Sequence, residues 1–585
     1  MKTLDHDQLA QWVLKRHETM ASKRAPWDAF WSDLADYCMP RKSEFMSTRD
    51  STNARLSPNV QKQTILFDNS MVQANMTLAN GCMSYLTPAD SRWFSFDSPA
   101  HLKGVDTVEQ YYRRCTEVAM LELARSNFYT EAHELYMDRG CFGTGVLHCE
   151  TGKRSFLNFR KFDVGTFSIA EDDEGYVDTL SREFYLTVRQ AVQWFGKEAV
   201  SDTLQKLFES GQAEQMEREF CFIHQIFPRA ADEIELDKKD TRNMPIASIY
   251  MERDKKLVVR ESGYTEQPFF ATRYLKWYAE NPYGWCPAWV ALPEARQLNF
   301  LQKQLDALAE LAAFPRFLVP DTHEGEVDYR ASGVTYFDPA NPNAIPKEWA
   351  TAGRYDAGKD RVVEKQKAID KAFHVDLFQM FANLDRPQMT AREVAERAGE
   401  KLIQFSPTFA RLTTELFTPL LRRVFNLLTR NGRLPPPPEE VIQQSPSGEA
   451  FLPEPEVVYS SKIALAIKSL ENASLMNTFE LWMPIGQAKP EILDNMNWDE
   501  AFRDSVRNAG LPARWLVEKE QVKQIRQARQ EEMERMQKQA EMAAQADAAG
   551  KVGSVKEDSL IGRALQKQEK AGAGVNGQRP GGLLG

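Results

Sequence analysis

The most regular pattern of apolar and polar residues lies between positions 289 and 373. In its first part, apolar residues recur at helical spacing at Leu298, Leu301, Leu305 and Leu308. In its second part, 358–373, one side carries Val362, Ile369 and Phe373. The proline-rich segment between them, 315–357, has short β-like runs at 316–319 and 334–337. The pattern predicts two helices joined by an irregular excursion, and so narrow an apolar face suits packing against neighbouring helices.

A tryptophan-rich stretch near the N-terminus, 4–38, also has helical spacing. It contains Trp12, Trp27 and Trp31, and each indole buries a large apolar area when it packs. We expect a packed pair of helices here. Two interpretations of the tryptophans remain open: they belong to the ordinary core, or they form an interface with a neighbouring subunit or a tail component.

The rest of the N-terminal half changes from helix to strand and back. Amphipathic stretches predict helices at 59–85, 105–140 and 188–218. Alternating and β-branched residues predict strands in 141–190, 219–229, 244–253, 256–261 and 268–276. The strands follow one another through short turns, so we expect an α+β domain with an antiparallel sheet.

The C-terminal half is predicted to be mainly helical. A long helix starts at Thr390 and has breaks near Pro407 and Pro419, because proline lacks a backbone donor and clashes with the preceding turn. Residues 457–518 are expected to be helical again. Residues 517–549 are almost all strong helix formers with a thin apolar face, which indicates a helix that is either solvated or assembled with copies of itself. The glycine-rich end of the chain is expected to be a flexible tail.

Length, composition and charge narrow the class of protein. A chain of 585 residues exceeds one ordinary core, so several domains or one elongated multi-part subunit is expected. Hydrophobic residues make up 42% of the sequence, which excludes a chain that is disordered throughout. The formal net charge of −10 argues against tight binding of a DNA backbone, which needs a basic face. It does not argue against a channel through which DNA slides.

The cysteines and the termini indicate where the protein is made. Seven cysteines are scattered without any CxxC pair, which favours reduced thiols and synthesis in the cytoplasm. The N-terminal residues are acidic where a signal peptide needs an apolar core. The sequence has no run of eighteen apolar residues. We therefore expect a soluble protein with no membrane partner.

No metal-binding motif in the sequence is complete. A histidine–glutamate pair begins at His133, but Met137 stands where the second zinc ligand of an HExxH motif belongs. Cys141, His148 and Cys149 offer three ligand atoms. Adjacent residues of a strand point to opposite faces, however, so His148 and Cys149 are not expected to share a metal.

The glycines that follow do not form a phosphate-binding loop. The spacing from Gly145 to Lys153 is too long, and Arg154 stands where a serine or threonine must hold magnesium. The FGTG sequence at 142–145 predicts instead a tight turn that lets two backbones approach. We nominate no catalytic, cofactor-binding or metal-binding residue, expect no cofactor, and do not expect an enzyme.

Five sequence blocks are informative when they are read together and in order. They are LANGCMSYLTPADSRWFSF (78–96), RGCFGTGVLHCE (139–150), WCPAWVALPEARQLNFLQKQLDALAELAAFP (285–315), LDRPQMTAREVAERAGEKLIQFSP (384–407) and ELFTPLLRRVFNLLTRNGRLPPPP (415–438). Together they resemble the portal (head-to-tail connector) proteins of short-tailed, podovirus-type bacteriophages. The resemblance covers nearly the whole chain apart from its C-terminal end, and no single catalytic motif carries it.

The resemblance implies an α+β, mainly helical fold. The subunit would be elongated and portal-type, with an α/β wing, a helical stem hairpin, a small β-containing clip, a helical crown and a C-terminal helix. The implied boundaries are an N-terminal wing at 1–288, stem helices at 289–314 and 358–373, the clip at 315–357, the tunnel loop at 374–390, a long kinked wing helix with a proline-rich spacer at 391–456, the crown at 457–516, a C-terminal helix (a possible barrel) at 517–549, and a flexible tail at 550–585.

The resemblance also implies which residues face DNA. In the family the tunnel loop lines the channel, and the matching apolar residues here are Phe378, Met380, Phe381 and Leu384. From the residues alone, a buried loop is the alternative. The flanking carboxylates and the apolar side chains form no charge-assisted bond to phosphate. They would therefore bind the DNA backbone weakly and let a duplex slide past.

Two further groups of residues are candidates for contact with other molecules. On the second stem helix, Lys365, Lys367 and Lys371 are possible phosphate contacts, although interleaved acidic residues fit a solvated mixed-charge face equally well. In the clip, Tyr336 and Phe337 are expected to dock partner proteins, since a family clip contacts the packaging motor and then the tail adaptor.

The function implied by the resemblance is a homo-oligomeric ring of about twelve subunits at one capsid vertex. The genome would be packaged and ejected through its DNA channel, and the ring would join head to tail. Expected partners are double-stranded DNA, the terminase motor, a tail adaptor protein, and the major capsid and scaffolding proteins. The protein would be assembled in the host cytoplasm and reside at the portal vertex of the virion. The alternative is another ring-forming head–tail adaptor or structural connector without the tunnel role.

Simple geometry supports a pore of the right size. Neighbouring helices pack about 8–10 Å apart, so about twelve of them in a ring have an axis-to-axis diameter of about 35 Å. Subtracting about one helix diameter leaves an opening of about 25 Å, which admits a B-form duplex.

Overall fold

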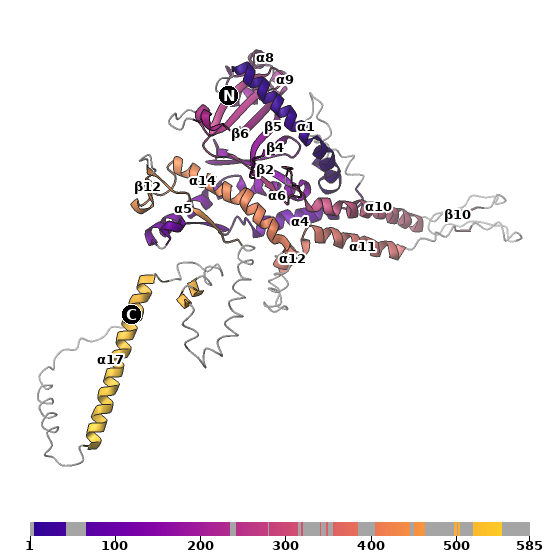
Figure 1. Ribbon diagram of the computed structural model, residues 1–585. Coiled ribbons are helices and arrows are strands. Elements are labelled where there is room, and N and C mark those ends of the chain that lie inside the picture. Colours follow the sequence, from indigo (N-terminus) through magenta and orange to yellow (C-terminus); the bar gives the residue numbers. More distant parts are fainter. Residues whose placement is uncertain are drawn as a thin grey trace. The chain divides into compact units, whose positions relative to one another are not determined.

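Figure 1 shows a computed structural model of the chain. The residues that it describes are 5–42, 66–103, 105–234, 241–278, 280–313, 317–319, 340, 347–348, 355–383, 404–444, 450–461, 497–499, 501–503, 517 and 519–552. The chain divides into two units, Met1–Ala488 and Lys489–Gly585. All strands in the described part of the chain belong to the first unit.

The largest sheet has five antiparallel strands in the order β4-β5-β6-β7-β8, so each strand pairs with its neighbour in sequence. These strands are β4 (Phe167–Glu171), β5 (Val177–Thr187), β6 (Glu219–Pro228), β7 (Ile246–Glu252) and β8 (Leu257–Tyr264). They lie where alternation and β-branching predicted strands. The predicted α+β class and antiparallel pairing are confirmed.

Helices cover both faces of this sheet. The helices concerned are α1 (His6–Cys38), α7 (Val188–Phe195) and α8 (Asp202–Glu209), and the short α9 (Ala213–Met216) follows α8 without a buried residue. On one face, Val13 of α1 packs in a cluster with Ile223 and Ile249. On the other face, residues of α7 and α8 pack in a cluster with Phe222 and Tyr250. The two clusters use alternate side chains of the same strands, as a sheet buried on both faces requires.

Helix α1 is one continuous helix of 33 residues, so the expected pair of helices at 4–38 is wrong. Asp5 and Gln8 form a capping box at its start, and Pro26 lies inside the helix without ending it. The first half of α1 packs on the sheet and the second half packs in the main core. These two sets of contacts hold α1 in place along its length. In the main core, Trp31 is fully buried and donates a hydrogen bond to the carbonyl oxygen of Phe142 at 3.1 Å. For Trp31, the core interpretation is confirmed.

A second, three-stranded antiparallel sheet has the order β3-β2-β9. Its strands are β2 (Thr144–Thr151), β3 (Leu157–Phe162) and β9 (Phe269–Arg273). Just before β2, Gly143 has a φ of +76°, and a Cβ there would collide with the carbonyl oxygen of Gly284. Only glycine combines this dihedral with so close an approach. The tight turn and close backbone approach predicted at 142–145 are confirmed.

The main core lies around three helices: α4 (Ser70–Tyr85), α5 (Asp106–Arg125) and α6 (Phe128–Phe142). Beside them, β1 (Phe94–Asp97) pairs with β14 (Glu456–Tyr459) in an antiparallel ribbon. The helix predicted from 457 is therefore wrong for its first residues, because Val457 and Val458 are β-branched and complete this ribbon. Most of the predicted crown, including 462–496, lies outside the described residues.

Residues 404–430 form one uninterrupted helical run, so the predicted breaks near Pro407 and Pro419 are wrong. The run contains a π-helical turn, Thr413–Phe417, followed by α14 (Thr418–Arg430). The wider turn accommodates Pro419, which has no backbone N–H to donate. The predicted start of this helix at Thr390 lies outside the described residues.

Two long helices, α10 (Pro287–Ala313) and α11 (Tyr355–Ala372), lie side by side (Figure 1). They agree with the helices predicted at 289–314 and 358–373, except that α11 starts before Gly358. Between them, β10 (Phe317–Leu318) pairs with β11 (Lys347–Glu348). The β-like run predicted at 316–319 thus contains a strand, whereas the one at 334–337 lies outside the described residues.

The second unit contains α17 (Lys519–Val552), which agrees with the helix predicted at 517–549. Near its start, both terminal nitrogens of Arg526 donate to the carboxylate of Asp499 at 2.6 Å. The glycine-rich tail beyond this helix lies outside the described residues. Within the part of the chain that the structure describes, no helix is both long and apolar enough to cross a membrane.

Candidate functional site

One apolar seam holds the hairpin of α10 and α11 together. Leu298 and Leu305 on α10 and Ile369 on α11 are buried in a common cluster. Gly358 brings the two helices into contact, because a Cβ at this position would lie 2.6 Å from Cδ2 of Leu305. The leucine face that the sequence predicted is therefore the seam of the hairpin.

The three lysines that were candidates for phosphate contact differ in their surroundings. Lys365 crosses the seam, where its Nζ lies 2.6 Å from Oε2 of Glu294, and its side chain is only 14% exposed. Lys367 and Lys371 are exposed. Lys365 is thus engaged within the subunit, and the other two lysines face solvent.

The segment predicted as a loop at 374–390 begins with a helix, α12 (Val375–Asn383), so the expectation of a loop is wrong for these residues. Phe378 in this helix is 4% exposed. Its ring lies on Gly81, where a Cβ would collide with it, and its centroid is 6.2 Å from that of Tyr85 and 5.8 Å from that of Phe405. In this conformation Phe378 belongs to the core, as the buried alternative expected.

The chain turns sharply between α11 and α12 at His374, whose φ of 55° lies in the left-handed region. The imidazole packs edge-on against Phe405, with ring centroids 5.7 Å apart. Burial lowers the pKa of His374 below its ordinary value. The turn below the hairpin is therefore held by packing against the helical run 404–430.

The remaining predicted site residues have no described side chains. Met380 and Phe381 lie in α12, but only their backbone is described. Leu384, Tyr336 and Phe337 lie outside the described residues. Their roles stay predictions.

Aromatic rings anchor the base of α10. Trp289 lies with its ring centroid 3.9 Å from that of Phe30 in α1 and 5.4 Å from that of Trp277. Tyr283, just before α10, lies 5.2 Å from Trp31 by the same measure. These contacts fix α10 to α1, while Trp277 itself remains 57% exposed.

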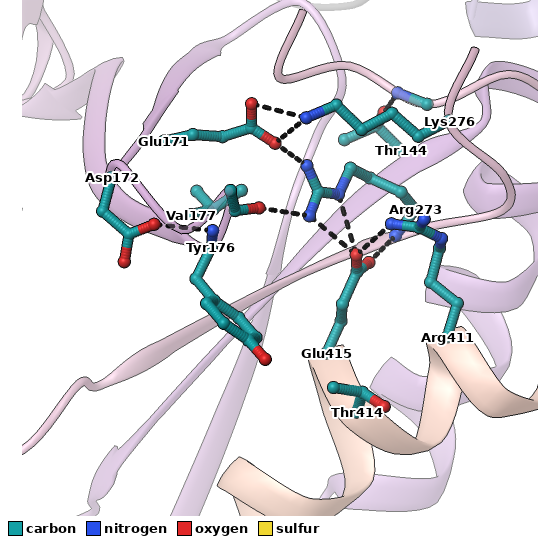
Figure 2. Close-up of polar contacts among 12 residues, drawn as sticks. Thr144, Glu171, Asp172, Tyr176, Val177, Arg273, Lys276, Arg411, Thr414 and Glu415 are labelled. Atoms are coloured by element: carbon teal, nitrogen blue, oxygen red, sulfur yellow. Dashed lines mark hydrogen bonds and ion pairs between the residues drawn. The ribbon is translucent and has the colours of Figure 1, made fainter. Parts of the chain in front are cut away.

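A buried group of charged residues joins the sheets to the helical run 404–430, as Figure 2 shows. Arg273 at the end of β9 donates its backbone N–H to Oε2 of Glu415 and its Nη2 to Oε1, both at 2.7 Å. Its Nη1 pairs with Glu171 at the end of β4. Lys276 also binds Glu171, at 2.6 Å, and Arg411 binds Glu415, at 2.7 Å. We call these five residues the Arg273 junction.

Electrostatics and helix geometry both stabilise the Arg273 junction. Burial alone lowers the pKa of the Arg273 guanidinium, but the bonds to Glu415 and Glu171 raise it above its ordinary value. Glu415 lies in the π-helical turn, and such turns re-aim side chains within a helix. Sequence reasoning missed this group, whose only signal is a charge at the end of the apolar strand FFATR.

A cleft of about 490 Å³ lies beside the Arg273 junction. It is lined by apolar residues of β9 and by side chains of both charges. Several of these charges pair with each other, for example Arg423 with Glu266 at 3.4 Å. We therefore assign the cleft to the packing between sheet and helix.

Cys141 at the end of α6 and the adjacent His148 and Cys149 of β2 were the candidate metal ligands. His148 stacks on Phe162 with ring centroids 5.6 Å apart, while the thiol of Cys286 donates to the backbone carbonyl of Cys141 at 3.1 Å. Among the residues that the structure describes, no group of three or more histidine, cysteine, aspartate or glutamate side chains could hold a metal ion. The three candidate ligands named from the sequence thus do not converge.

Comparison with known proteins identifies the family. The model of the family "Bacteriophage head to tail connecting protein" matches residues 10–517, and the chain belongs to this family. The chain is 30% identical over 521 residues to the "Probable portal protein" of Bordetella phage BPP-1. The aligned region covers 87% of this chain and 89% of that relative. The chain is 29% identical over 523 residues to the "Portal protein" of Salmonella phage epsilon15, with the same shares covered. The family resemblance of the five sequence blocks is confirmed.

Proposed function

We propose that this chain is a portal protein, a non-enzymatic virion component that forms a ring at one vertex of a phage capsid. The genome passes through the central channel when it is packaged and again when it is ejected. The ring joins the head to the tail and needs no cofactor. Membership of the head to tail connecting family, together with two portal-named relatives that cover most of the chain, supports this proposal.

The α10–α11 hairpin is the observation that carries the proposal. Its two helices share a single seam, and much of their remaining surface is exposed. A hairpin of this kind, repeated about twelve times around an axis, encloses an opening of about 25 Å. The exposed Lys367 and Lys371 are the candidates for phosphate contact there, because Lys365 is bound to Glu294. A few lysines separated by acidic residues give weak contacts, which suits a duplex that must slide.

The other segments receive the roles that the family implies. The segment 315–357, with Tyr336 and Phe337, is the clip that docks the terminase motor and later the tail adaptor. Met380, Phe381 and Leu384 form the channel-facing tip of the tunnel segment. The major capsid and scaffolding proteins surround the ring, which is assembled in the host cytoplasm. A ring-forming adaptor without the tunnel role is the alternative function.

Electron microscopy of the purified full-length protein tests the ring, and packaging tests the channel. We expect rings with a central opening. We also expect the variant Met380→Ser/Phe381→Ser/Leu384→Ser to assemble normally but to yield fewer heads that retain DNA, because the collar around the duplex is altered.

Phe378→Ser is the matched control for this experiment. It should reduce the yield of folded protein instead, because Phe378 is buried on Gly81. If the triple variant packages and retains DNA at the normal yield, the adaptor alternative is favoured. If the unmodified protein forms no rings, the proposed function is wrong.

A further inference from the structure

Helix α10 has an exposed face without any charge. One of its faces carries the seam leucines, and another carries exposed charges such as Lys303 and Glu310. The third face follows i, i+3, i+4 spacing and consists of Val290, Pro293, Gln297, Phe300, Gln304 and Ala307, all of them exposed. Phe300 is 62% exposed, so a large aromatic ring contacts solvent in the single subunit. Such a face points to a protein partner.

Helix α11 exposes an apolar residue on the opposite edge of the hairpin. Val363 is 41% exposed and lies about 120° round α11 from the seam residue Ile369. Phe300 lies about 140° round α10 from the seam residue Leu305. Because the two helices run in opposite directions, Phe300 and Val363 point outward from opposite edges of the hairpin. One copy cannot bring Phe300 and Val363 together, whereas two copies side by side can.

Phe300 and Val363 also lie at the same level along the hairpin. The two helices touch where Gly358 meets Leu305. Five residues from this contact toward the base of the hairpin, α10 has Phe300 and α11 has Val363. Subunits related by rotation about an axis keep the same height on that axis, so a contact between hairpins that stand round a ring joins residues of equal level.

Toward the base, Gln297 of α10 and Gln366 of α11 share the next level, three residues below the apolar pair. Gln366 is engaged within its own subunit, because its amide donates to Oδ2 of Asp68 at 3.1 Å. It also borders a groove of about 280 Å³ between α4, α11 and α12. We therefore restrict the match to Phe300 and Val363.

We propose that the uncharged face of α10 in one subunit packs against the Val363 edge of α11 in the next subunit, with Phe300 against Val363. The occupant of this face is a second copy of the chain. The contact joins two different surfaces, and a contact of this type closes a ring when it is repeated by rotation. This inference rests on the ring that the proposed function requires.

Charges next to the two surfaces favour the same pairing. Lys303 and Asp360 are exposed on the two outer edges and share a level, two residues from the Gly358–Leu305 contact toward the base. A uniformly uncharged face is also a poor surface for DNA, because phosphates bind cationic groups.

One like-charged pair shares a level as well. Arg296 and Lys367 share a level at the rim of the proposed contact, where Lys367 remains exposed, and Arg296 is bound to Asp33 at 3.1 Å within its own subunit. The carboxylate of Asp33 offsets this repulsion.

Thiol cross-linking of the full-length protein tests the contact. The seven native cysteines are buried, so a short bismaleimide reacts preferentially with introduced cysteines. We expect the double variant Phe300→Cys/Val363→Cys to give a ladder of covalent oligomers on a denaturing gel. Each single variant is expected to give none, because neither residue meets its own copy in a head-to-tail contact.

The matched control places the second cysteine on another side of the same helix. Ala368 is exposed and lies about 140° round α11 from Val363, so Phe300→Cys/Ala368→Cys should give no ladder. A ladder from this control, or none from the Val363 variant in assemblies that electron microscopy shows to be rings, overturns the contact but not the portal proposal. If the unmodified protein forms no rings, both are wrong.

Charge reversal gives a second readout without cysteines. Lys303→Asp and Asp360→Lys are each expected to lower the fraction of rings in light scattering severalfold. Each variant places two like charges opposite each other, at position 303 of one subunit and position 360 of the next. The double variant should restore the fraction to that of the unmodified protein. Equal ring fractions in all four proteins, or no restoration in the double variant, overturn the pairing.

Discussion

The Arg273 junction and the α10–α11 hairpin differ in how far the subunit encloses them. At the junction, the side chains of Arg273 and Glu415 are 2% and 7% exposed and lie between the sheets and a helix. In the hairpin, Ile369 and its neighbours form one buried seam, while Phe300 and Val363 on the outer edges face solvent. The same chain thus buries the central charges of the junction almost completely and leaves the outer edges of the hairpin exposed.

This difference separates what one subunit stabilises from what an assembly adds. Burial of apolar area is the main favourable contribution to folding, so two helices that share one seam gain a limited amount of it. A buried charge is stable only when its partners are fixed, and the Arg273 junction supplies them. We therefore expect substitutions at the junction to act on folding of the subunit and substitutions on the hairpin edges to act on assembly.

The largest effect is expected at Glu415. Glu415→Gln removes the carboxylate that binds Arg273 and Arg411, so the buried guanidinium of Arg273 keeps Glu171 as its ion-pair partner and loses the other. Removing one partner of a buried ion pair costs about 3–5 kcal/mol. We expect a clearly lower melting temperature and less assembled protein, measured by circular dichroism and light scattering.

An exposed pair provides the matched control for Glu415. Glu456 binds Lys103 at 2.6 Å, but both side chains are nearly half exposed. Exposed pairs contribute about 0–1 kcal/mol, so Glu456→Gln should leave the melting temperature almost unchanged. Equal losses in the two variants would mean that the enclosure of the junction does not matter.

The next effect is a dependence of stability on pH in the sheet region. Burial, followed by the nearby positive charge of Arg182, holds the pKa values of His148 and His224 well below the ordinary 6.5. Nδ1 of His224 accepts from Nε of Arg182 at 3.3 Å, and its Nε2 lies 3.0 Å from Oγ of Ser248, so the neutral ring fits this site. The positive charge of Arg160 also lowers the pKa of both histidines.

The sign of this dependence follows from linkage. Below pH 6.5 the unfolded chain binds protons at these histidines and the folded chain does not, so stability falls as the pH falls. Each histidine contributes up to about 1.4 kcal/mol per pH unit in that window. Melting temperatures between pH 7.5 and pH 5 should show the decline. His224→Gln, which keeps one acceptor and one donor, should make the decline shallower; an unchanged slope would exclude His224 as its source.

The sequence was sufficient for the elements whose signal is local. The leucine spacing predicted α10, β-branched alternation predicted the strands, and FGTG predicted the turn at Gly143, because a few neighbouring residues determine each of them. The Arg273 junction could not be found this way. Arg273 lies 102 residues from Glu171 and 142 from Glu415, and no motif connects them.

Other errors arose where tertiary packing decided between two local possibilities. The apolar residues around Phe378 suit either a channel tip or a core, and the bare backbone at Gly81 creates the space that buries the ring. Proline predicted breaks at Pro407 and Pro419, but the helix continues past both, and the π-helical turn just before Pro419 accommodates the absence of a backbone donor in this proline. At 4–38 we predicted two helices, but α1 is a single helix whose first half packs in one apolar cluster and whose second half packs in another.

The smallest effect is expected from two lysines of α11 that the sequence treated alike. Lys365 is bound to Glu294 across the seam, so Lys365→Gln should lower the stability of the hairpin by up to about 1 kcal/mol, the range of a partly exposed pair. Lys367 is exposed, so Lys367→Gln should leave the melting temperature unchanged. The two substitutions remove the same charge from different faces of one helical turn, which makes them a matched pair.

The same two variants sharpen the contrast between subunit and assembly when DNA is measured. If Lys367 faces the channel, the Lys367→Gln ring presents fewer cations to the duplex, and the amount of DNA retained in filled heads should depend less on salt. Lys365→Gln should not change this salt dependence, because its ammonium group is held at Glu294. Packaging particles with each variant and measuring DNA retention across a salt series gives both results. The reverse outcome, in which only Lys365→Gln alters retention, would show that the seam opens when DNA passes and that the hairpin is not the fixed element described here.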